Sequence, residues 1–197
     1  MTKDFRRCAV PLCLGLLAAL VVAGGCRSKP LSPIERVRLA RQEAETLTGQ
    51  AATLRHTDDE KAERLLLKAI RVDPACIAAR NNLGALYLDR GDLYRAAVEL
   101  ELAVSLDSQR AAPHHNLALV FEQSGRYEAA AEELEAARRL DSGNTEIEKA
   151  LARVWHRLGR SDEAMRSLVT KLRQTVHDPV WVAWLNETAE SLGQPAP

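Results

Sequence analysis

Residues 82–103 of the chain read NLGALYLDRGDLYRAAVELELA, and residues 116–137 repeat the pattern as NLALVFEQSGRYEAAAEELEAA. A constant 34-residue step relates equivalent positions in the two segments. A constant period of this kind indicates a repeat protein, in which one supersecondary unit recurs along the chain. The same 34-residue step relates Ala62, Ala96, Ala130 and Ala164; Leu66, Leu100, Leu134 and Leu168; Leu83, Leu117 and Leu151; Tyr87, Phe121 and Trp155; and Gly91, Gly125 and Gly159.

Each period predicts a pair of helices. Apolar residues recur at intervals of three and four over 83–90 and again over 96–103, which is typical of amphipathic helices. Gly91, between them, favours the left-handed conformation that ends many helices. Asp92 places a negative charge near the start of the next helix, where the helix dipole favours it. A single hairpin of this kind cannot bury its own apolar face, so the hairpins are expected to stack in an all-α fold.

These residues resemble the tetratricopeptide repeat (TPR) family. The family pattern contains Leu followed by Gly or Ala, an aromatic residue, a turn glycine, a small residue and a closing alanine. The resemblance implies an α-solenoid, a TPR superhelix of about 3.5 repeats with a C-terminal capping helix, and it implies protein binding. The matching residues are Leu83-Gly84, Tyr87, Gly91, Ala96 and Ala103; Leu117-Ala118, Phe121, Gly125, Ala130 and Ala137; and Leu151-Ala152, Trp155, Gly159 and Ala164, with Lys171 in place of the last closing alanine.

The repeats also predict the domain boundaries. We expect a repeat domain over 34–178, consisting of a degenerate first repeat at 34–76 and full repeats at 77–110, 111–144 and 145–178. The first repeat is degenerate because its first helix lacks the Leu-Gly pair and the aromatic residue. A capping helix is expected over 179–193, before a loose tail at 194–197. Its Trp181, Trp184 and Leu185 are expected to face the stack.

The beginning of the repeat domain is predicted from a capping signal. Ser32 and Glu35 have the spacing of a capping box, and Pro33 occupies the favoured first helical position. The helix that follows is expected to run to about Leu54. Its predicted apolar stripe is Val37, Ala40, Ala44, Leu47, Ala51 and Leu54.

Residues 1–25 have the three-part form of a secretory signal. Lys3, Arg6 and Arg7 supply the positive end, and an apolar stretch covers residues 9–23. That stretch is shorter than the roughly 20 residues that a spanning helix needs. A retained transmembrane anchor is the alternative interpretation.

The signal ends in Val22-Ala23-Gly24-Gly25-Cys26, which resembles the lipobox of bacterial lipoproteins, although most members have Leu where this chain has Ala23. The resemblance implies cleavage before Cys26 and acylation of that cysteine, and hence an extracytoplasmic, lipid-anchored protein. Arg27, the residue after this cysteine, resembles the residue found there in lipoproteins on the periplasmic face of the outer membrane. Residues 26–33 would form a tether, and the seven residues from Arg27 to Pro33 can span at most about 25 Å.

Composition and motifs favour no catalytic or nucleic-acid function. Lys plus Arg and Asp plus Glu both total 27, so the basic excess of a nucleic-acid binder is lacking. The sequence has no phosphate-binding glycine loop, no His-Glu-x-x-His pair and no Cys-x-x-Cys pair. We therefore predict no enzyme, no cofactor and no metal site. The acidic residues Glu132, Glu133, Glu146 and Glu148 are predicted to lie on a solvated face, and Cys76 is predicted to be a buried small apolar residue.

The resemblance places a partner on the concave face that the first helices of the hairpins form. Asn82 and Asn116 precede the Leu-Gly and Leu-Ala pairs, and a side-chain amide can both donate to and accept from a ligand backbone. Family members that bind acidic C-terminal tails use a Lys and Asn clamp, but the clamp lysine positions here hold Asn81 and Glu146. Such a chaperone tail is therefore not expected. The predicted groove residues are Asn82, Asp89, His115, Asn116, Gln123, Lys149, Arg153 and Arg157, the last three forming a basic end that would favour an acidic segment.

The sequence therefore predicts a membrane-anchored scaffold that binds a protein or peptide segment. Repeat lipoproteins of this appearance commonly serve pilus assembly or secretion, and the tight-adherence and type IV pilus groups are similar in plan. One alternative is a regulator that docks peptidoglycan enzymes. The other is a self-associating structural lipoprotein that uses Trp181 and Trp184.

Overall fold

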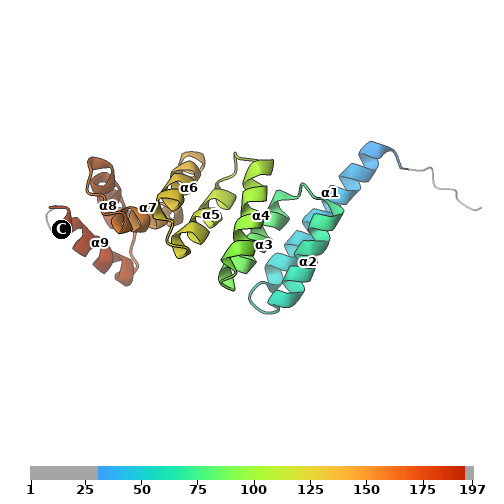
Figure 1. Cartoon of the computed structure of the whole chain (residues 1–197), viewed down its shortest axis with the longest axis horizontal. Helices are drawn as coiled ribbons and strands as arrows, with labels where there is room; N and C mark the ends of the chain where they lie inside the picture. Colours follow the sequence, from blue (N-terminus) through green and yellow to red (C-terminus); the bar gives the residue numbers. More distant parts are fainter. Residues whose placement is uncertain (1–30, 194–197) are drawn as a thin grey trace, which may run out of the picture. The chain divides into compact units, whose positions relative to one another are not determined.

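The computed structural model describes residues 31–193, and all regular structure in that range is helical. The predicted signal, Cys26 and most of the tether lie outside the described residues, as does the tail at 194–197. The predicted all-α solenoid is confirmed (Figure 1). The described helices are α1 Pro33–Leu54, α2 Asp59–Val72, α3 Ile77–Asp89, α4 Leu93–Leu106, α5 Ala111–Gln123, α6 Tyr127–Leu140, α7 Thr145–Arg157, α8 Glu163–Thr175 and α9 Pro179–Ser191.

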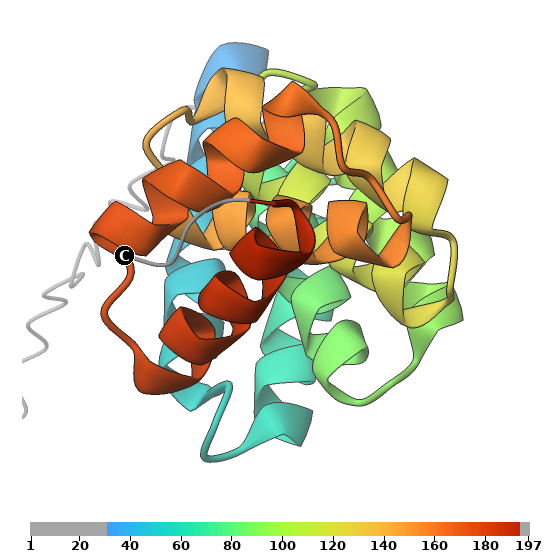
Figure 2. The same ribbon diagram turned by 90° about the vertical axis from the view of Figure 1, so that its left-hand side faces the viewer.

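The helices pack as consecutive hairpins. Each helix contacts the next one along the chain, and the first helices of neighbouring hairpins, α1, α3, α5 and α7, also contact one another. Among residues 31–193 the second helices α2, α4, α6 and α8 have no comparable mutual contacts. The first helices are therefore closer together and line the concave side of the repeat unit. Figure 2 views this unit from the end that carries α9.

Small residues bring the two helices together in the hairpins α1–α2, α3–α4 and α5–α6. Ala62, Ala96 and Ala130 are at most 1% exposed, and each is followed four residues later by a buried leucine. An alanine side chain ends at Cβ and loses no rotamer entropy, so it allows close helix packing at little cost. The helices also approach closely at Gly84, where an added Cβ would lie 2.5 Å from Cγ of Leu100. Among residues 31–193 the buried aromatic side chains of this core are Tyr87, Phe121 and Trp155.

Helix ends follow the predicted capping signals. Ser32 and Glu35 form the reciprocal capping box at the start of α1. Asp92 accepts a hydrogen bond from the backbone N–H of Arg95 at the start of α4. The glycines that follow α3, α5 and α7 have φ values between 67° and 74°, the left-handed region predicted for helix ends. Gly193, one further 34-residue step along the chain, continues this series after α9.

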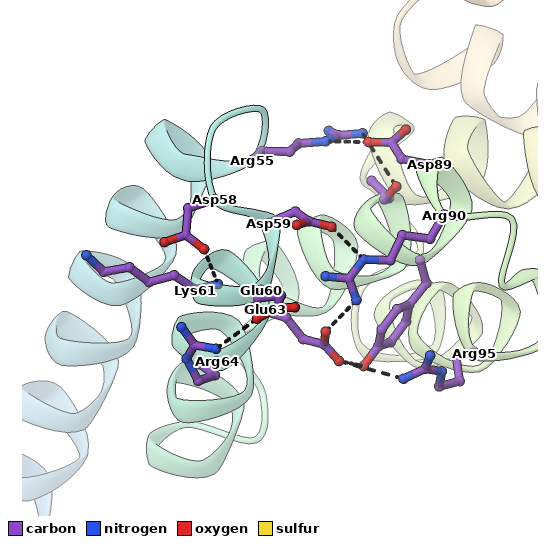
Figure 3. A network of polar contacts seen from close by, with 12 residues as sticks. Arg55, Asp58, Asp59, Glu60, Lys61, Glu63, Arg64, Asp89, Arg90 and Arg95 are labelled. Atoms are coloured by element: carbon purple, nitrogen blue, oxygen red, sulfur yellow. Dashed lines mark hydrogen bonds and ion pairs between the residues drawn. The ribbon is translucent and has the colours of Figure 1, made fainter.

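A polar network joins the first two hairpins (Figure 3). The Arg90 guanidinium donates to Asp59 at 2.8 Å and to Glu63 at 2.5 Å, and the Tyr87 hydroxyl donates to Glu63 at 3.0 Å. Burial raises the pKa of Glu63, but the hydrogen bonds from Arg90 and Tyr87 outweigh it, so the pKa lies below its ordinary value. The Arg95 guanidinium covers the Tyr87 ring at 4.3 Å from its centroid. These contacts fix α2 against α3 and α4.

The 34-residue step slips by one residue in α8. Ala164, predicted to be a buried small residue, is exposed, and Met165 is fully buried in its place. Leu172, not Lys171, is buried at the place that the closing alanines Ala103 and Ala137 occupy in the earlier repeats. The cause is the connection between α7 and α8, which runs over 158–162 and is longer than the equivalent connection at 124–126. The connection before α9 is shorter by one residue than the one before α7, so α9 returns to the 34-residue step.

Two further predictions about burial were wrong. Val37 was assigned to the apolar stripe of α1 but is 70% exposed, since the first turns of α1 have no helix packed against them. Glu148 was assigned to a solvated face but is buried, and its carboxylate forms an ion pair with Lys171 of α8. The one-residue slip in α8 brings Lys171 to this position. Cys76 is buried, as predicted.

Two glycine substitutions test the close packing of α3 and α4. Gly84→Ala should lower the free energy of unfolding by about 1–2 kcal/mol, because crowding against Leu100 outweighs the helix propensity gained. Gly49→Ala, in the exposed middle of α1 with open space around it, should raise that free energy by about 0.5–1 kcal/mol. Urea unfolding of both variants measures whether the free energy of unfolding falls for Gly84→Ala and rises for Gly49→Ala. Stabilisation by Gly84→Ala would contradict the packing described.

Candidate functional site

The candidate site is the concave face formed by the first helices. Positions related by the 34-residue step occupy the same place on successive helices, so the face consists of rows of equivalent side chains. One row is Arg55, Asp89, Gln123 and Arg157. The remaining predicted groove residues come from α3, α5 and α7 at one-turn steps from this row.

Arg55 and Asp89 join α1 to α3. The Arg55 guanidinium donates to the Asp89 carboxylate at 2.6 and 2.9 Å (Figure 3). Asp89, predicted to face a partner, is therefore already bound within the chain. Arg55 was missed from the sequence because the first repeat is degenerate. The signal that could have found it is its position, one full 34-residue step before Asp89.

Amide side chains join α3 to α5. Asn116 Nδ2 donates to Asn81 Oδ1 at 2.9 Å, and Asn81 Nδ2 donates to Asn82 Oδ1 at 3.3 Å. The Nδ2 group of Asn82 has no hydrogen-bond partner within residues 31–193 and remains available as a donor. Of the two amides predicted to meet a ligand, Asn116 thus uses its donor group within the chain, whereas Asn82 uses its acceptor oxygen.

The predicted basic end of the groove contains acidic partners. The Arg153 guanidinium of α7 binds both carboxylate oxygens of Glu122 in α5, at 2.5 and 2.7 Å, and this hydrogen bonding raises the pKa of Arg153 above its ordinary value. Lys149 donates to Glu146 at 3.0 Å. Arg157 is exposed and has no ion-pair partner in the described part of the chain. The positive charge predicted there is therefore largely balanced.

The tryptophans of α9 lie against this end of the face. Lys149 Nζ lies 4.7 Å from the ring centroid of Trp181, within reach of a cation–π interaction. Trp184 forms an edge contact with His156, at 5.5 Å between ring centroids. Since α9 keeps the 34-residue step, Trp184 occupies the position that Asn82 and Asn116 hold in earlier repeats. The cap helix thus extends the row of first helices, which the sequence interpretation did not include.

His115 and Gln123 complete the face. Gln123 is exposed, and no side-chain hydrogen bond to it is formed by residues 31–193. His115 is half-buried between α5 and α7, and burial lowers its pKa below the ordinary 6.5, with Glu146 and Glu122 opposing the shift and Arg153 adding to it. A pKa below 6.5 favours the neutral imidazole at pH 7, which can both donate and accept a hydrogen bond.

A pocket of about 220 Å³ opens beside Asn82, between α1, α2 and α3. Its walls include Leu66 and Leu86, with Arg55 and His56 near the opening. The pocket combines apolar walls with an amide donor and a guanidinium, the composition expected of a small binding recess. It is one place where a partner side chain could be held.

The other buried histidine is structural. His114 Nδ1 lies 2.6 Å from Glu133, and its Nε2 lies 3.2 Å from the backbone oxygen of Ser108. These contacts hold α5 against α6 and the preceding turn. Over residues 31–193 no group of three or more His, Cys, Asp or Glu side chains could hold a metal ion. No helix in that range combines the length and apolar character needed to cross a bilayer.

Fold and site together define a class, the α-solenoids, in which repeated helical hairpins present one concave face. Models of the tetratricopeptide repeat match residues 52–113 and residues 122–183, which together are 124 of the 197 residues. The chain belongs to the tetratricopeptide repeat family. No curated protein matches it significantly in sequence.

Solved structures share the fold. PilF of Pseudomonas aeruginosa superposes with a TM-score of 0.69 at 19% identity, over 80% of this chain and 74% of that chain. The first TPR domain of Spaghetti (RPAP3), bound to an HSP90 peptide, gives 0.58 at 18% identity, over 61% of this chain and 96% of that one. An O-GlcNAc transferase from Thermobaculum terrenum gives 0.62 at 25% identity, over 71% of this chain. The present chain covers only 27% of that enzyme.

The lowered pKa of His115 predicts a pH effect on stability. The unfolded chain protonates this imidazole near its ordinary pKa, whereas the folded chain does so only at lower pH, so folding stability falls as pH drops below about 6.5. Between pH 7 and pH 5, the free energy of unfolding measured in urea should fall more for the wild type than for His115→Gln. Equal losses in the two proteins would refute the assignment.

Proposed function

We propose that this protein is a lipid-anchored adaptor that holds a segment of a partner protein on its concave face. The observation that carries the proposal is the bridging of neighbouring first helices by side chains. Arg55 with Asp89, Asn116 with Asn81, and Arg153 with Glu122 each span two helices. The face is thereby fixed before a partner arrives, and such preorganisation reduces the entropy lost on binding.

Four of the predicted groove residues are left for a partner. Asn82 has a free amide donor, His115 is a neutral imidazole, and Gln123 and Arg157 are exposed. Three of these groups can pair with a peptide backbone whatever its sequence, because amides and neutral imidazole both donate and accept. The pocket beside Asn82 would accept one small apolar side chain. We infer that the segment is bound through its backbone with a single apolar anchor.

Relatives support protein binding in general. Tetratricopeptide repeats generally mediate protein–protein interaction, and the Spaghetti domain was solved with an HSP90 peptide. An acidic chaperone tail is a poor candidate for this chain, because the clamp lysine positions hold Asn81 and Glu146. Glu146 would repel an acidic terminus. The proposed partner segment is therefore not a strongly acidic one.

Position-specific crosslinking tests the binding face. A photo-crosslinking amino acid at position 123 should capture one partner from envelope extract, whereas the same group at the exposed position 132 of α6 should not. Asn82→Ala combined with Arg157→Glu should weaken that capture about tenfold, the loss expected from removing two polar contacts. Equal capture from positions 123 and 132, or unchanged capture by the double variant, would place the binding surface elsewhere.

The anchor is proposed from residues outside the described range. The lipobox-like Val22-Ala23-Gly24-Gly25-Cys26 supports cleavage and acylation at Cys26, and Arg27 supports the periplasmic face of the outer membrane. Cells fed radioactive palmitate should label the wild-type protein and leave Cys26→Ala unlabelled. Label in both proteins would rule out Cys26 as the acylated residue.

We further propose envelope assembly, in a pilus or secretion machine, as the setting. The support is the combination of a signal with a lipobox-like end and a repeat domain suited to protein binding. The partner captured through position 123 distinguishes the alternatives. Pilin or secretin subunits would favour the proposal, hydrolases or synthases would favour regulation of peptidoglycan enzymes, and a second copy would favour a self-associating lipoprotein.

A further inference from the structure

The beginning of α1 extends beyond the repeat pattern. The 34-residue step aligns α3, Ile77–Asp89, with residues 43–55, so residues 33–42 are additional helical turns. Every buried residue of α1 lies after position 42. Figure 1 shows these turns projecting past the neighbouring helix α2. The extension contributes nothing to the core of the stack.

Large apolar side chains are exposed on this extension. Ile34 is 81% exposed and Val37 is 70% exposed. The two residues lie three positions apart and so share one face of the helix. Arg38 and Arg41 line the same shallow apolar hollow as these two residues. The extension therefore has an apolar face edged by guanidinium groups.

The extension is also basic. Residues 33–42 contain Arg36, Arg38 and Arg41 and a single acidic residue, Glu35, whose carboxylate already accepts from the Ser32 backbone. None of the three arginines forms an ion pair with a carboxylate of residues 31–193, in contrast to Arg55, Arg90 and Arg153 of the stack. Their charges are free to meet an external anion.

We propose that residues 33–41 form a membrane-contacting surface that lies in the headgroup region of an anionic phospholipid bilayer. Ile34 and Val37 would enter the boundary between headgroups and acyl chains, as the apolar face of an interfacial helix does. Arg38 and Arg41 would keep their aliphatic stems on this apolar face while their guanidinium groups reach lipid phosphates.

Chain length and charge favour lipid over a second copy of the protein. This inference rests on the anchoring proposed above, in which an acylated Cys26 holds α1 within about 25 Å of the bilayer surface. Pairing of two copies through this face would bring Arg38 and Arg41 of both copies together, while the one carboxylate of residues 33–42, that of Glu35, already accepts from the Ser32 backbone. A bilayer offers phosphate groups to Arg38 and Arg41, which line the apolar hollow, and each cation near an anionic surface strengthens attachment.

The test uses the chain from residue 27 without any acyl group. Among residues 31–193 the buried core residues lie between Ala44 and Ala189, and residues 32–197 form a compact unit without the preceding segment. Vesicles of phosphatidylethanolamine with phosphatidylglycerol should sediment this fragment, and vesicles of phosphatidylcholine alone should sediment much less. Ile34→Ser with Val37→Ser should lower the partition coefficient at least about tenfold.

A matched control removes two equally exposed apolar residues elsewhere. Tyr94 and Val180 are 79% and 77% exposed, and Tyr94→Ser with Val180→Ser should leave the partition coefficient unchanged. Arg38→Glu with Arg41→Glu should abolish the preference for phosphatidylglycerol. All three variants should retain the wild-type helical circular dichroism and urea midpoint within error, since none of the changed residues is buried.

Three outcomes would overturn the proposal. The first is no sedimentation of the wild-type fragment with phosphatidylglycerol vesicles, and the second is equal partitioning of the wild type and the Ile34 and Val37 variant. The third is a mass that rises with protein concentration in light scattering for the wild type and for the other two variants, but not for the variant changed at Ile34 and Val37. That result would assign the surface to a second copy. Because the fragment carries no lipid, these outcomes are independent of whether Cys26 is acylated.

Discussion

The contact on which the structure depends is the approach of two helices at an alanine. Ala62, Ala96 and Ala130 occupy the same place in successive hairpins and are almost completely buried. A larger side chain there would push the second helix away and open the space that the leucine four residues later now fills. Each hairpin has a second apolar face, in addition to the one between its own two helices. That face is buried only when the neighbouring hairpins stack against it. The curvature follows from the same packing, since the first helices contact one another and, within residues 31–193, the second helices have no comparable contacts.

This curvature determines what the concave face can do. First helices that lie close together can bridge through side chains, and the structure uses Arg55 with Asp89 and Arg153 with Glu122 in this way. Each bridge removes a charge that a sequence interpretation would assign to a partner. The remaining groups, chiefly amides and one neutral imidazole, suit recognition of a backbone better than recognition of charge. A cluster of exposed, unbridged arginines lies instead at the beginning of α1, outside the stack.

The period predicted the hairpins and the glycine-terminated helices, and the resemblance to the tetratricopeptide repeat family placed Asn82 and Gln123 on the concave face. Three features could not be predicted for physical reasons. Leu168 remains buried at the 34-residue step, so the one-residue slip in α8 is hidden until the length of the preceding connection is seen. Arg55 follows a first helix that lacks the Leu-Gly pair and the aromatic residue, and only its spacing from Asp89 indicates its role. The exposure of Val37 depends on which helices reach it, which periodicity does not specify.

The central claim is that each hairpin is stabilised by burial between its neighbours. Amide hydrogen exchange followed by mass spectrometry tests it most directly, because protection reports the local free energy of opening along the chain. We expect the slowest exchange in α4, α5 and α6, which have neighbours on both sides, and faster exchange in α9. The residues of α1 before Glu43 should exchange fastest among the helices. Slowest exchange in α9 or at the start of α1 would contradict it.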